Sequence, residues 1–210
     1  MRMWMLVASL MQIIQHSIAA VPMAIVGYLP EWRFEGANWD TLCQTYTHLI
    51  IFSLEPSKDG HIVALDRMPR PMLLEEAREA ARRHGTRILI CFGGNGRSGG
   101  FGGMVRSAQA RRRFVAELME LCRTHGFHGV DYNWEYPGYS FGAGYASTGV
   151  INAEYKGLAS LIQETRAAFA ANPSTDTVIV LFPSWSSARV LVYVWCVVRR
   201  LCLNCGPALR

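Results

Sequence analysis

The sequence has few charged side chains, and over most of its length they nearly cancel. Only 18% of the 210 residues are charged, and the formal net charge is +5. The excess lies at the ends: four arginines and no acidic residue follow Ser187, and without those four the chain holds 17 basic and 16 acidic residues. Proteins that bind nucleic acid carry a concentrated basic surface. The sequence therefore predicts no nucleic-acid partner and is compatible with a neutral substrate.

Beyond its first twenty residues the chain also lacks a long hydrophobic run. No later segment reaches the roughly 18 apolar residues that a membrane helix needs, so we predict no membrane span. Residues 1–20 have an early arginine, a moderately apolar stretch and small residues before and at Ala20. That pattern favours a secretory signal peptide and a secreted protein. An ordinary apolar lead-in is the alternative, because two glutamines and a histidine dilute the stretch.

Motifs for metals, disulfide frameworks and phosphates are missing as well. Six cysteines are present, but without the spacing of a disulfide-rich domain, and Cys43, Cys91 and Cys122 lie in apolar segments typical of buried thiols. The CLNC at 202–205 has no second cysteine pair and no nearby histidine. The glycine-rich stretch GGNGRSGGFGG at 93–103 lacks the context of a phosphate-binding motif. We predict no metal, no cofactor and a flexible loop at this stretch.

Apolar segments that read as strands alternate with amphipathic helices. Strands are predicted at 24–32, 47–56, 86–94, 128–137 and 177–182, and helices just after Asn38, over 71–84, from Ser107 to Gly126 and over 154–171. This alternation is typical of parallel βαβ units, which close either as a doubly wound open sheet or as a (β/α)₈ barrel. In both folds the chemistry lies at the carboxyl ends of the strands.

One predicted strand carries polar side chains at alternating positions. In HGVDYNWEYP, Asp131, Asn133 and Glu135 stand two residues apart and share one face, at intervals of roughly 6–7 Å. The residues that take the opposite face are Val130, Tyr132 and Trp134. Burying three polar groups is costly unless they bond to one another or reach water at the strand end. The pattern indicates a functional site, with a hydrogen-bonded structural patch as the alternative.

These residues resemble glycoside hydrolase family 18, the chitinases and chitinase-like lectins, whose strand-four motif is D-G-x-D-x-D-x-E followed by Tyr-Pro. GYLPEW is similar to the strand-one motif G-Y-x-x-x-W, and CFGG is similar to S-x-G-G with Cys91 in place of serine. THLIIFSL resembles the second strand, where Phe52 would line the barrel. The likeness covers residues 24–182.

The resemblance implies an α/β fold with a parallel (β/α) barrel of the TIM type, here incomplete, with about five of eight strands. We therefore expect a partial glycoside hydrolase domain over 21–183. The family's M-x-Y-D motif and its strand-eight tryptophan are not found. Residues 184–210 contain no acid and no helical period, which predicts an atypical tail outside the barrel and an interrupted coding region.

The resemblance also implies a mechanism. Glu135 matches the general acid that protonates the glycosidic oxygen, and the acetamido group of the substrate replaces a protein nucleophile. Asn133 stands where the family has an aspartate that orients the acetamido group, with Asp131 behind it. An amide still accepts a hydrogen bond but offers no full charge, which predicts a weakened enzyme. His128 also departs from the motif, and could still pair with Asp131.

A set of aromatic residues and glycines is expected to bind substrate: Tyr28, Trp32, Phe52, Gly93, Gly94 and Tyr136. Trp134 is either a sugar platform or part of the core, and Asn95 and Arg97 could reach sugar hydroxyls. The predicted partner is chitin or another oligosaccharide containing N-acetylglucosamine, bound by a monomer. A hydrolase of β-1,4 linkages in chitin catabolism is the leading interpretation. A chitin- or N-glycan-binding lectin and an inactive truncated fragment are the alternatives.

Overall fold

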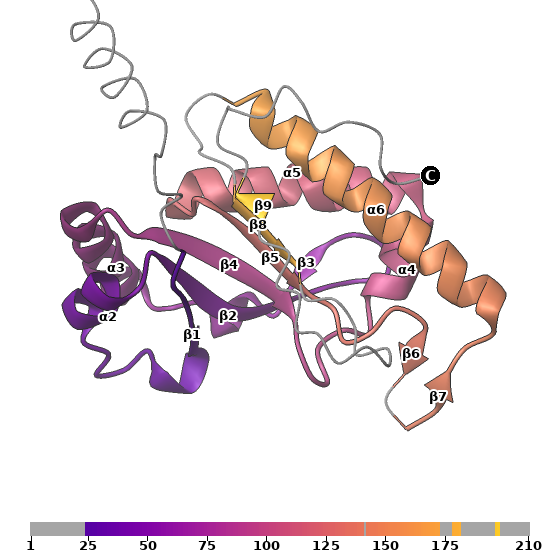
Figure 1. Ribbon diagram of the computed structural model, residues 1–210, viewed down its shortest axis with the longest axis horizontal. Helices are drawn as coiled ribbons and strands as arrows, with labels where there is room; N and C mark the ends of the chain where they lie inside the picture. Colours follow the sequence, from indigo (N-terminus) through magenta and orange to yellow (C-terminus); the bar gives the residue numbers. More distant parts are fainter. Residues whose placement is uncertain (1–23, 141, 173–177, 182–195, 198–210) are drawn as a thin grey trace, which may run out of the picture.

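Five parallel strands organise the part of the protein that the structure describes. This computed structural model describes residues 24–140, 142–172, 178–181 and 196–197. The strands lie side by side in the order β1 (Val26–Pro30), β2 (His48–Pro56), β4 (Arg87–Gly93), β5 (Gly129–Asn133) and β8 (Val178–Leu181) (Figure 1). Each corresponds to one of the five predicted strands, which are thereby confirmed. Two short strands pair antiparallel, β3 (Ile62–Val63) with the last residues of β2 and β9 (Cys196–Val197) with β8.

The order of the strands distinguishes the two closures that the sequence left open. A doubly wound sheet reverses direction, so that its first strand lies in the interior of the sheet. Here β1 lies at the edge, and each later parallel strand is added on the same side as the one before it. That winding is the one found in a (β/α) barrel. The predicted TIM-type fold is confirmed, with the barrel incomplete.

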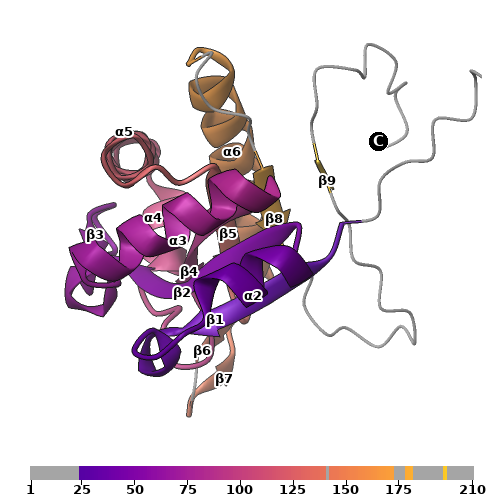
Figure 2. The same ribbon diagram turned by 90° about the vertical axis from the view of Figure 1, so that its left-hand side faces the viewer.

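Helices lie between the strands, and those over 39–45, 71–84 and 108–125 match the sequence prediction. The four longest in the described part are α2 (Trp39–Thr45), α3 (Pro71–His84), α5 (Ala108–His125) and α6 (Thr148–Ala170). The side chains of Asn38 and Ser107 cap α2 and α5 by accepting backbone N–H groups at 3.0 and 3.3 Å. Gly85 and Gly126 end α3 and α5 with φ angles of 71° and 72°, a conformation that glycine adopts without strain. Figure 2 shows α2, α3 and α5 packed along the sheet.

Side chains alternate between the two faces of the sheet. On the helix side, residues such as Ile90, Val130 and Tyr132 join the main hydrophobic core. On the other face a smaller cluster contains Ile50, Leu89 and Cys91, with Val26 and Phe52 against it. The predicted alternation of side chains along β5 is therefore confirmed for Val130 and Tyr132. Asp131 lies on the opposite face, away from the helices.

The strands predicted at 24–32 and 128–137 end earlier, at Pro30 and Asn133. Two helices also differ from the prediction. The glycine-rich stretch 93–103 was expected to be a flexible loop, but its last residues begin helix α4 (Phe101–Arg106), because Phe101, Met104 and Val105 bury their side chains in the core. Helix α6 begins at Thr148 rather than at 154. Residues 148–153 are exposed or only half-buried, so they lack the apolar period that reveals a helix in sequence.

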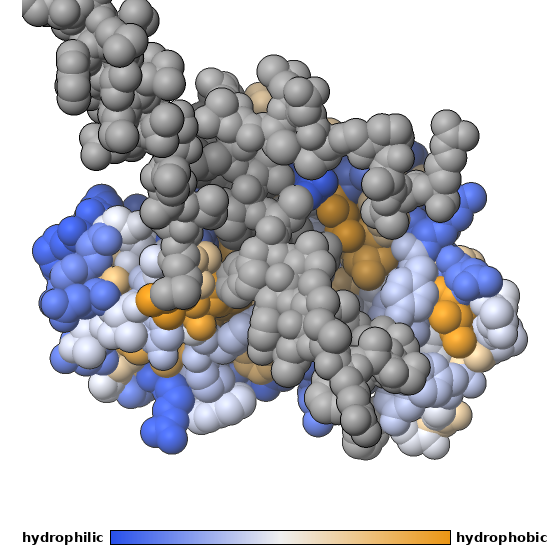
Figure 3. Space-filling model, in the orientation of Figure 1, coloured by the Kyte–Doolittle hydropathy of each residue, from blue (hydrophilic) through white to orange (hydrophobic). Residues whose placement is uncertain are grey.

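The termini carry several predictions that remain untested. The predicted signal peptide at 1–20, the CLNC at 202–205 and all of the predicted tail except β9 lie outside the described residues. In the part that is described, Cys43, Cys91 and Cys122 are buried free thiols, as predicted. None of the helices in that part is both long and apolar enough to cross a membrane. Figure 3 shows a mainly hydrophilic surface over α2 and α3.

Candidate active site

A cavity of about 330 Å³ opens at the carboxyl ends of β1, β2 and β5. It brings together five of the residues that the sequence singled out, Tyr28, Trp32, Phe52, Asn133 and Glu135, along with Pro30. β1 ends at Pro30, and the short 3₁₀ turn η1 (Glu31–Arg33) that follows leaves Trp32 66% exposed at the rim. The rings of Tyr28 and Phe52 meet edge to face, with centroids 6.1 Å apart. Parallel strands thus collect side chains distant in sequence at one edge of the sheet.

Asp131 lies beneath this cavity and is completely buried. Its Oδ2 accepts a hydrogen bond from the Tyr28 hydroxyl at 3.0 Å, while its Oδ1 has no partner among the described residues. Burial raises the pKa of Asp131 to about 7, against the opposing effects of the neighbouring Cys91 thiol and the Tyr28 hydroxyl. Burial, followed by the charge of Asp131, raises the pKa of Tyr28 far above its usual range, so the phenol stays a donor. The Asp131 carboxyl therefore exchanges its proton near neutral pH.

Asn133 is the last residue of β5, and its side-chain oxygen is available to a ligand. The residue is 7% exposed, and Oδ1 is buried without a hydrogen-bond partner in the described part of the chain. A buried acceptor left unsatisfied costs about 1–3 kcal/mol, so a donor supplied by a ligand would relieve that cost. Asn133 therefore offers an acceptor to an N–H or O–H group entering the cavity.

Gly93 and Gly94, predicted to bind substrate, are both buried behind this end of the sheet. A Cβ on Gly93 would stand 2.5 Å from the Asn133 carbonyl oxygen, and one on Gly94 would stand 2.6 Å from the Phe52 ring. Their φ angles are 98° and 100°. The two glycines therefore let the chain after β4 pass close to Asn133 and Phe52. The structure gives them this packing role, and their contact with substrate stays a prediction.

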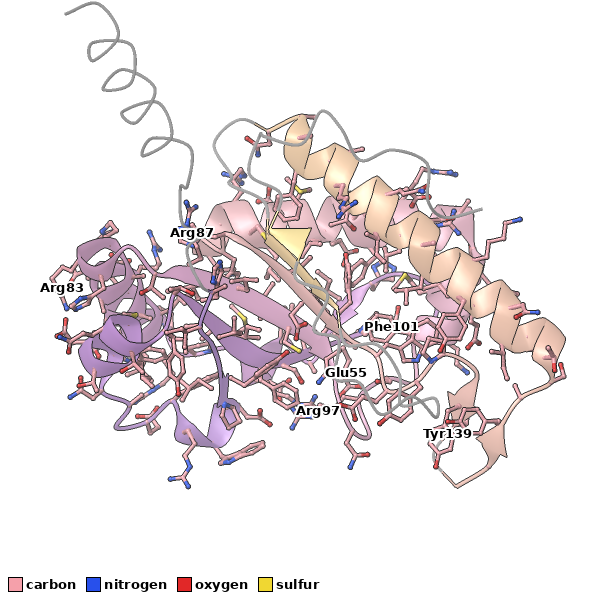
Figure 4. The ribbon with its side chains drawn as sticks, viewed as in Figure 1. Glu55, Arg83, Arg87, Arg97, Phe101 and Tyr139 are labelled. Carbon is pink, nitrogen blue, oxygen red and sulfur yellow. The ribbon has the colours of Figure 1, made fainter. Side chains whose placement is uncertain are left out.

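The Arg97 side chain is bonded to residues of the first two strands, β1 and β2, or just beyond them. Its guanidinium forms an ion pair with Glu31, donates to Ser53 Oγ at 3.1 Å and lies 5.3 Å from the centroid of the Phe52 ring. The pKa of Glu31 is lowered by its hydrogen bond to Arg97, against the effect of burial. Figure 4 shows Arg97 at the same end of the molecule as Glu55 and Tyr139. The suggested contact of Arg97 with sugar hydroxyls would have to compete with Glu31.

A second cavity, of about 700 Å³, also borders Glu135. Glu135 lines both cavities, and Tyr136 faces the second. The further walls come from the loop after β4 and from a hairpin that the sequence analysis missed, β6 (Tyr139–Ser140) and β7 (Gly144–Tyr145). The recurring tyrosines and glycines of YPGYSFGAGY were the feature of the sequence that could have indicated this hairpin. Glu135 is therefore the one described carboxylate shared by the two spaces.

Trp134 and His128 are placed by other contacts. Trp134 is 4% exposed and stacks on Phe101, with ring centroids 5.1 Å apart and an interplanar angle of 12°. Of the two possibilities for this tryptophan, the structure supports core packing. His128 precedes β5, and its Nδ1 accepts the backbone N–H of Ile88 at 3.1 Å.

Among the described residues no group of three His, Cys, Asp or Glu side chains is arranged to hold a metal ion.

The loop after Glu135 is held by a buried carboxylate on α6. Glu154 is 7% exposed, and its Oε2 accepts the backbone N–H of Gly138 at 2.5 Å. We expect Glu154→Ala to lower the free energy of unfolding by about 2 kcal/mol, because the buried N–H loses its acceptor. Glu154→Gln keeps an acceptor and should cost less. Urea unfolding measures both, with exposed Gln163→Ala on the same helix as control; equal values for all three would show that the bond contributes nothing.

Comparison with known proteins gives one consistent result. The family model for glycosyl hydrolases family 18 matches residues 24–189. A class V chitinase of Arabidopsis thaliana is 22% identical over 165 residues, which are 78% of this chain and 40% of that protein. An oviduct-specific glycoprotein of Bos taurus is 28% identical over 142 residues, 64% of this chain and 26% of the glycoprotein.

Solved structures agree on the fold. A group IV chitinase of Ostrinia furnacalis, solved with allosamidin, has a TM-score of 0.59 at 18% identity and covers 76% of this chain. A chitinase-like agglutinin of Robinia pseudoacacia has a TM-score of 0.57 at 21% identity and covers the same share. The aligned part is 43% of the first chain and 46% of the second. The chain thus spans less than half the length of these relatives and shares their fold over that part.

Proposed function

The chain belongs to glycosyl hydrolase family 18, and we propose that it is a chitinase-like hydrolase of β-1,4-linked N-acetylglucosamine. The observation that carries this proposal is the position of Glu135. Glu135 lines a cavity whose other walls include Asn133 and the aromatic residues Tyr28, Trp32 and Phe52. Aromatic rings offer apolar faces to the C–H faces of a sugar, and the amide offers a polar contact. A proton donor beside such a cavity suits cleavage of a glycosidic bond.

In the proposed reaction Glu135 gives its proton to the glycosidic oxygen as the bond from that oxygen to C1 breaks. The carbonyl oxygen of the substrate's own 2-acetamido group attacks C1 and forms an oxazolinium ion, so no protein nucleophile is required. The Glu135 carboxylate then removes a proton from a water molecule whose oxygen bonds to C1, as the bond from C1 to the acetamido oxygen breaks. Two displacements at C1 retain its configuration.

Asn133 supplies the contact that this mechanism needs from its neighbour. Its buried Oδ1, which has no hydrogen-bond partner among the described residues, is an acceptor for the acetamido N–H. That bond would turn the acetamido carbonyl toward C1. A neutral amide gives less help than a carboxylate to the positive charge that develops on the oxazolinium ion. We therefore propose a working but slow site.

The proposal predicts that Asn133→Asp accelerates catalysis. Restoring a charged acceptor adds about 1.5–3 kcal/mol of transition-state stabilisation, which corresponds to a rate gain of about 10- to 150-fold. Fluorophore release from a chitotriose conjugate measures the rate, and NMR of the first product tests retention at C1. Asn152→Asp, at an exposed position on α6, is the matched control. An unchanged or lower rate in Asn133→Asp would contradict the role given to Asn133, and inversion at C1 would exclude the substrate-assisted route.

The same asparagine favours a second candidate, a lectin that binds these sugars without cleaving them. One of the similar structures is itself a chitinase-like agglutinin. In this case calorimetry would detect chitooligosaccharide binding to the parent chain, while the fluorophore assay would stay silent in the parent and in Asn133→Asp. Turnover by either protein would decide for the hydrolase.

A further inference from the structure

The loop between β4 and α4, residues 94–100, is bonded to the backbone of Glu135. The Oγ atom of Ser98 accepts the backbone N–H of Glu135 at 3.4 Å, and the same hydroxyl donates to the Gly94 carbonyl at 3.1 Å. Ser98 also lines the cavity of about 700 Å³ that Glu135 borders. The position of this loop therefore bears on the position of Glu135.

The residue before Ser98 is Arg97, which holds the loop to the ends of two strands. Two guanidinium nitrogens of Arg97 bond the two carboxylate oxygens of Glu31, one of them at 3.1 Å. A planar pair of this kind fixes orientation as well as distance. The guanidinium also donates to Ser53 Oγ at 3.1 Å and lies 5.3 Å from the centroid of the Phe52 ring. Glu31 follows β1, and the other two residues belong to β2.

Arg97 and Glu31 stand behind the walls of the two cavities. Neither is among the residues that line these cavities, but Trp32 and Phe52 line the smaller one and Ser98 lines the larger one. The side chains of Arg97 and Glu31 are 18% and 23% exposed, so dissolved ions screen the pair only in part. Any effect of Arg97 on a reaction in the cavities would therefore pass through its neighbours.

We infer that Arg97 is a positioning residue, which by pairing with Glu31 holds the loop after β4 and thereby sets where Glu135 stands when it gives up its proton. This inference rests on the proposed function, in which Glu135 is the proton donor. Arg97 itself touches no reacting atom. A small displacement of a catalytic group lowers the rate of the chemical step steeply. Loss of the pair should therefore affect kcat more than KM.

Kinetics of the chitotriose conjugate test this directly. Arg97→Ala should lower kcat about tenfold and change KM less than about threefold, because the residues that line the cavities remain. Arg97→Lys keeps the charge but cannot form two parallel bonds to Glu31, so it should recover only part of the loss. The matched control is Arg111→Ala. It removes another partly buried ion pair, to Glu164 at 2.9 Å between α5 and α6, and should lower stability without changing kcat.

A double variant tests whether the pair is the cause. If Glu31 and Arg97 act together, Glu31→Ala combined with Arg97→Ala should have a kcat within about twofold of Arg97→Ala alone. Multiplied losses would mean that the two side chains act independently, and they would overturn the inference. An equal fall of kcat in Arg111→Ala would overturn it as well, because the effect would then follow from lost stability.

Hydrogen exchange provides a readout that does not require turnover. The amides of 94–101 should exchange about tenfold faster in Arg97→Ala and at the parent rate in Arg111→Ala, because only the first change releases the loop. Faster exchange beside an inactive parent would mean that the proposed function fails while Arg97 still fixes the loop. Unchanged exchange in Arg97→Ala overturns the inference whether or not the parent is active, as does an unchanged kcat in an active one.

Discussion

Glutamine at position 135 should reduce kcat by about 1,000-fold while leaving oligosaccharide binding nearly intact, because the amide has the shape of the acid but cannot give up its proton to the leaving oxygen. Glu135 lines both cavities. Replacing it should therefore impair proton transfer to the leaving oxygen more than it impairs oligosaccharide binding in the cavities. Turnover of the chitotriose conjugate and calorimetry with chitooligosaccharides measure the two effects separately.

The control for this prediction is Glu79→Gln, at an exposed carboxylate on α3. It should leave both turnover and binding unchanged. Turnover that survives in Glu135→Gln would require another proton donor. Asp131, with its pKa of about 7 directly below the cavity, would then be the group to replace next. Loss of binding together with turnover would instead indicate that Glu135 contributes mainly to holding the sugar.

The free energy of unfolding should fall by roughly 4 kcal/mol as the pH rises from about 4 to about 7, through Asp131 alone. Burial raises the pKa of Asp131 from 3.8 to about 7. Between these values the folded protein keeps the proton and the unfolded chain releases it. The stabilising contribution is therefore complete below pH 4 and is lost as the pH rises through the folded pKa. Above pH 7 the loss is complete and the curve should level.

Asp131→Asn removes the titrating group and keeps the shape of the side chain. Urea unfolding of both proteins at several pH values gives the difference between them, in which the contributions of groups distant from Asp131 cancel. That difference should change with pH in the window given above, whereas Asp66→Asn, at an exposed position, should run parallel to the parent. Parallel curves for the parent and Asp131→Asn would show that Asp131 stays ionised in the folded protein.

Strand β5 shows what could be predicted from the sequence. Side chains alternate along any strand, so the spacing of Asp131 and Asn133 was enough to put them opposite Val130 and Tyr132. The caps of α2 and α5 were equally local, because Asn38 and Ser107 bond to N–H groups three residues away. These are features in which a residue and its partner lie close together in the chain.

Helix α4 shows why the rest could not be predicted. Its neighbourhood is glycine-rich, which by local propensity argues against a helix. A Cβ on Gly100 would stand 1.7 Å from the Pro56 carbonyl oxygen, and one on Gly102 would stand 2.5 Å from Glu154. The glycines allow the helix to approach β2 and α6, and Phe101 anchors it on Trp134. Such contacts join segments far apart in sequence, as does the link from Arg97 to Glu31.

The separation of the two faces of the sheet has a consequence for engineering. Residues such as Ile90 and Tyr132 contact the helices, whereas Phe52, Asp131 and Asn133 belong to the opposite face or its open end. Substitutions on different faces share few neighbours, so their effects should combine additively. A thermostable variant can therefore be selected by repacking the helix side, with cavity residues left for a separate library that alters the preferred sugar.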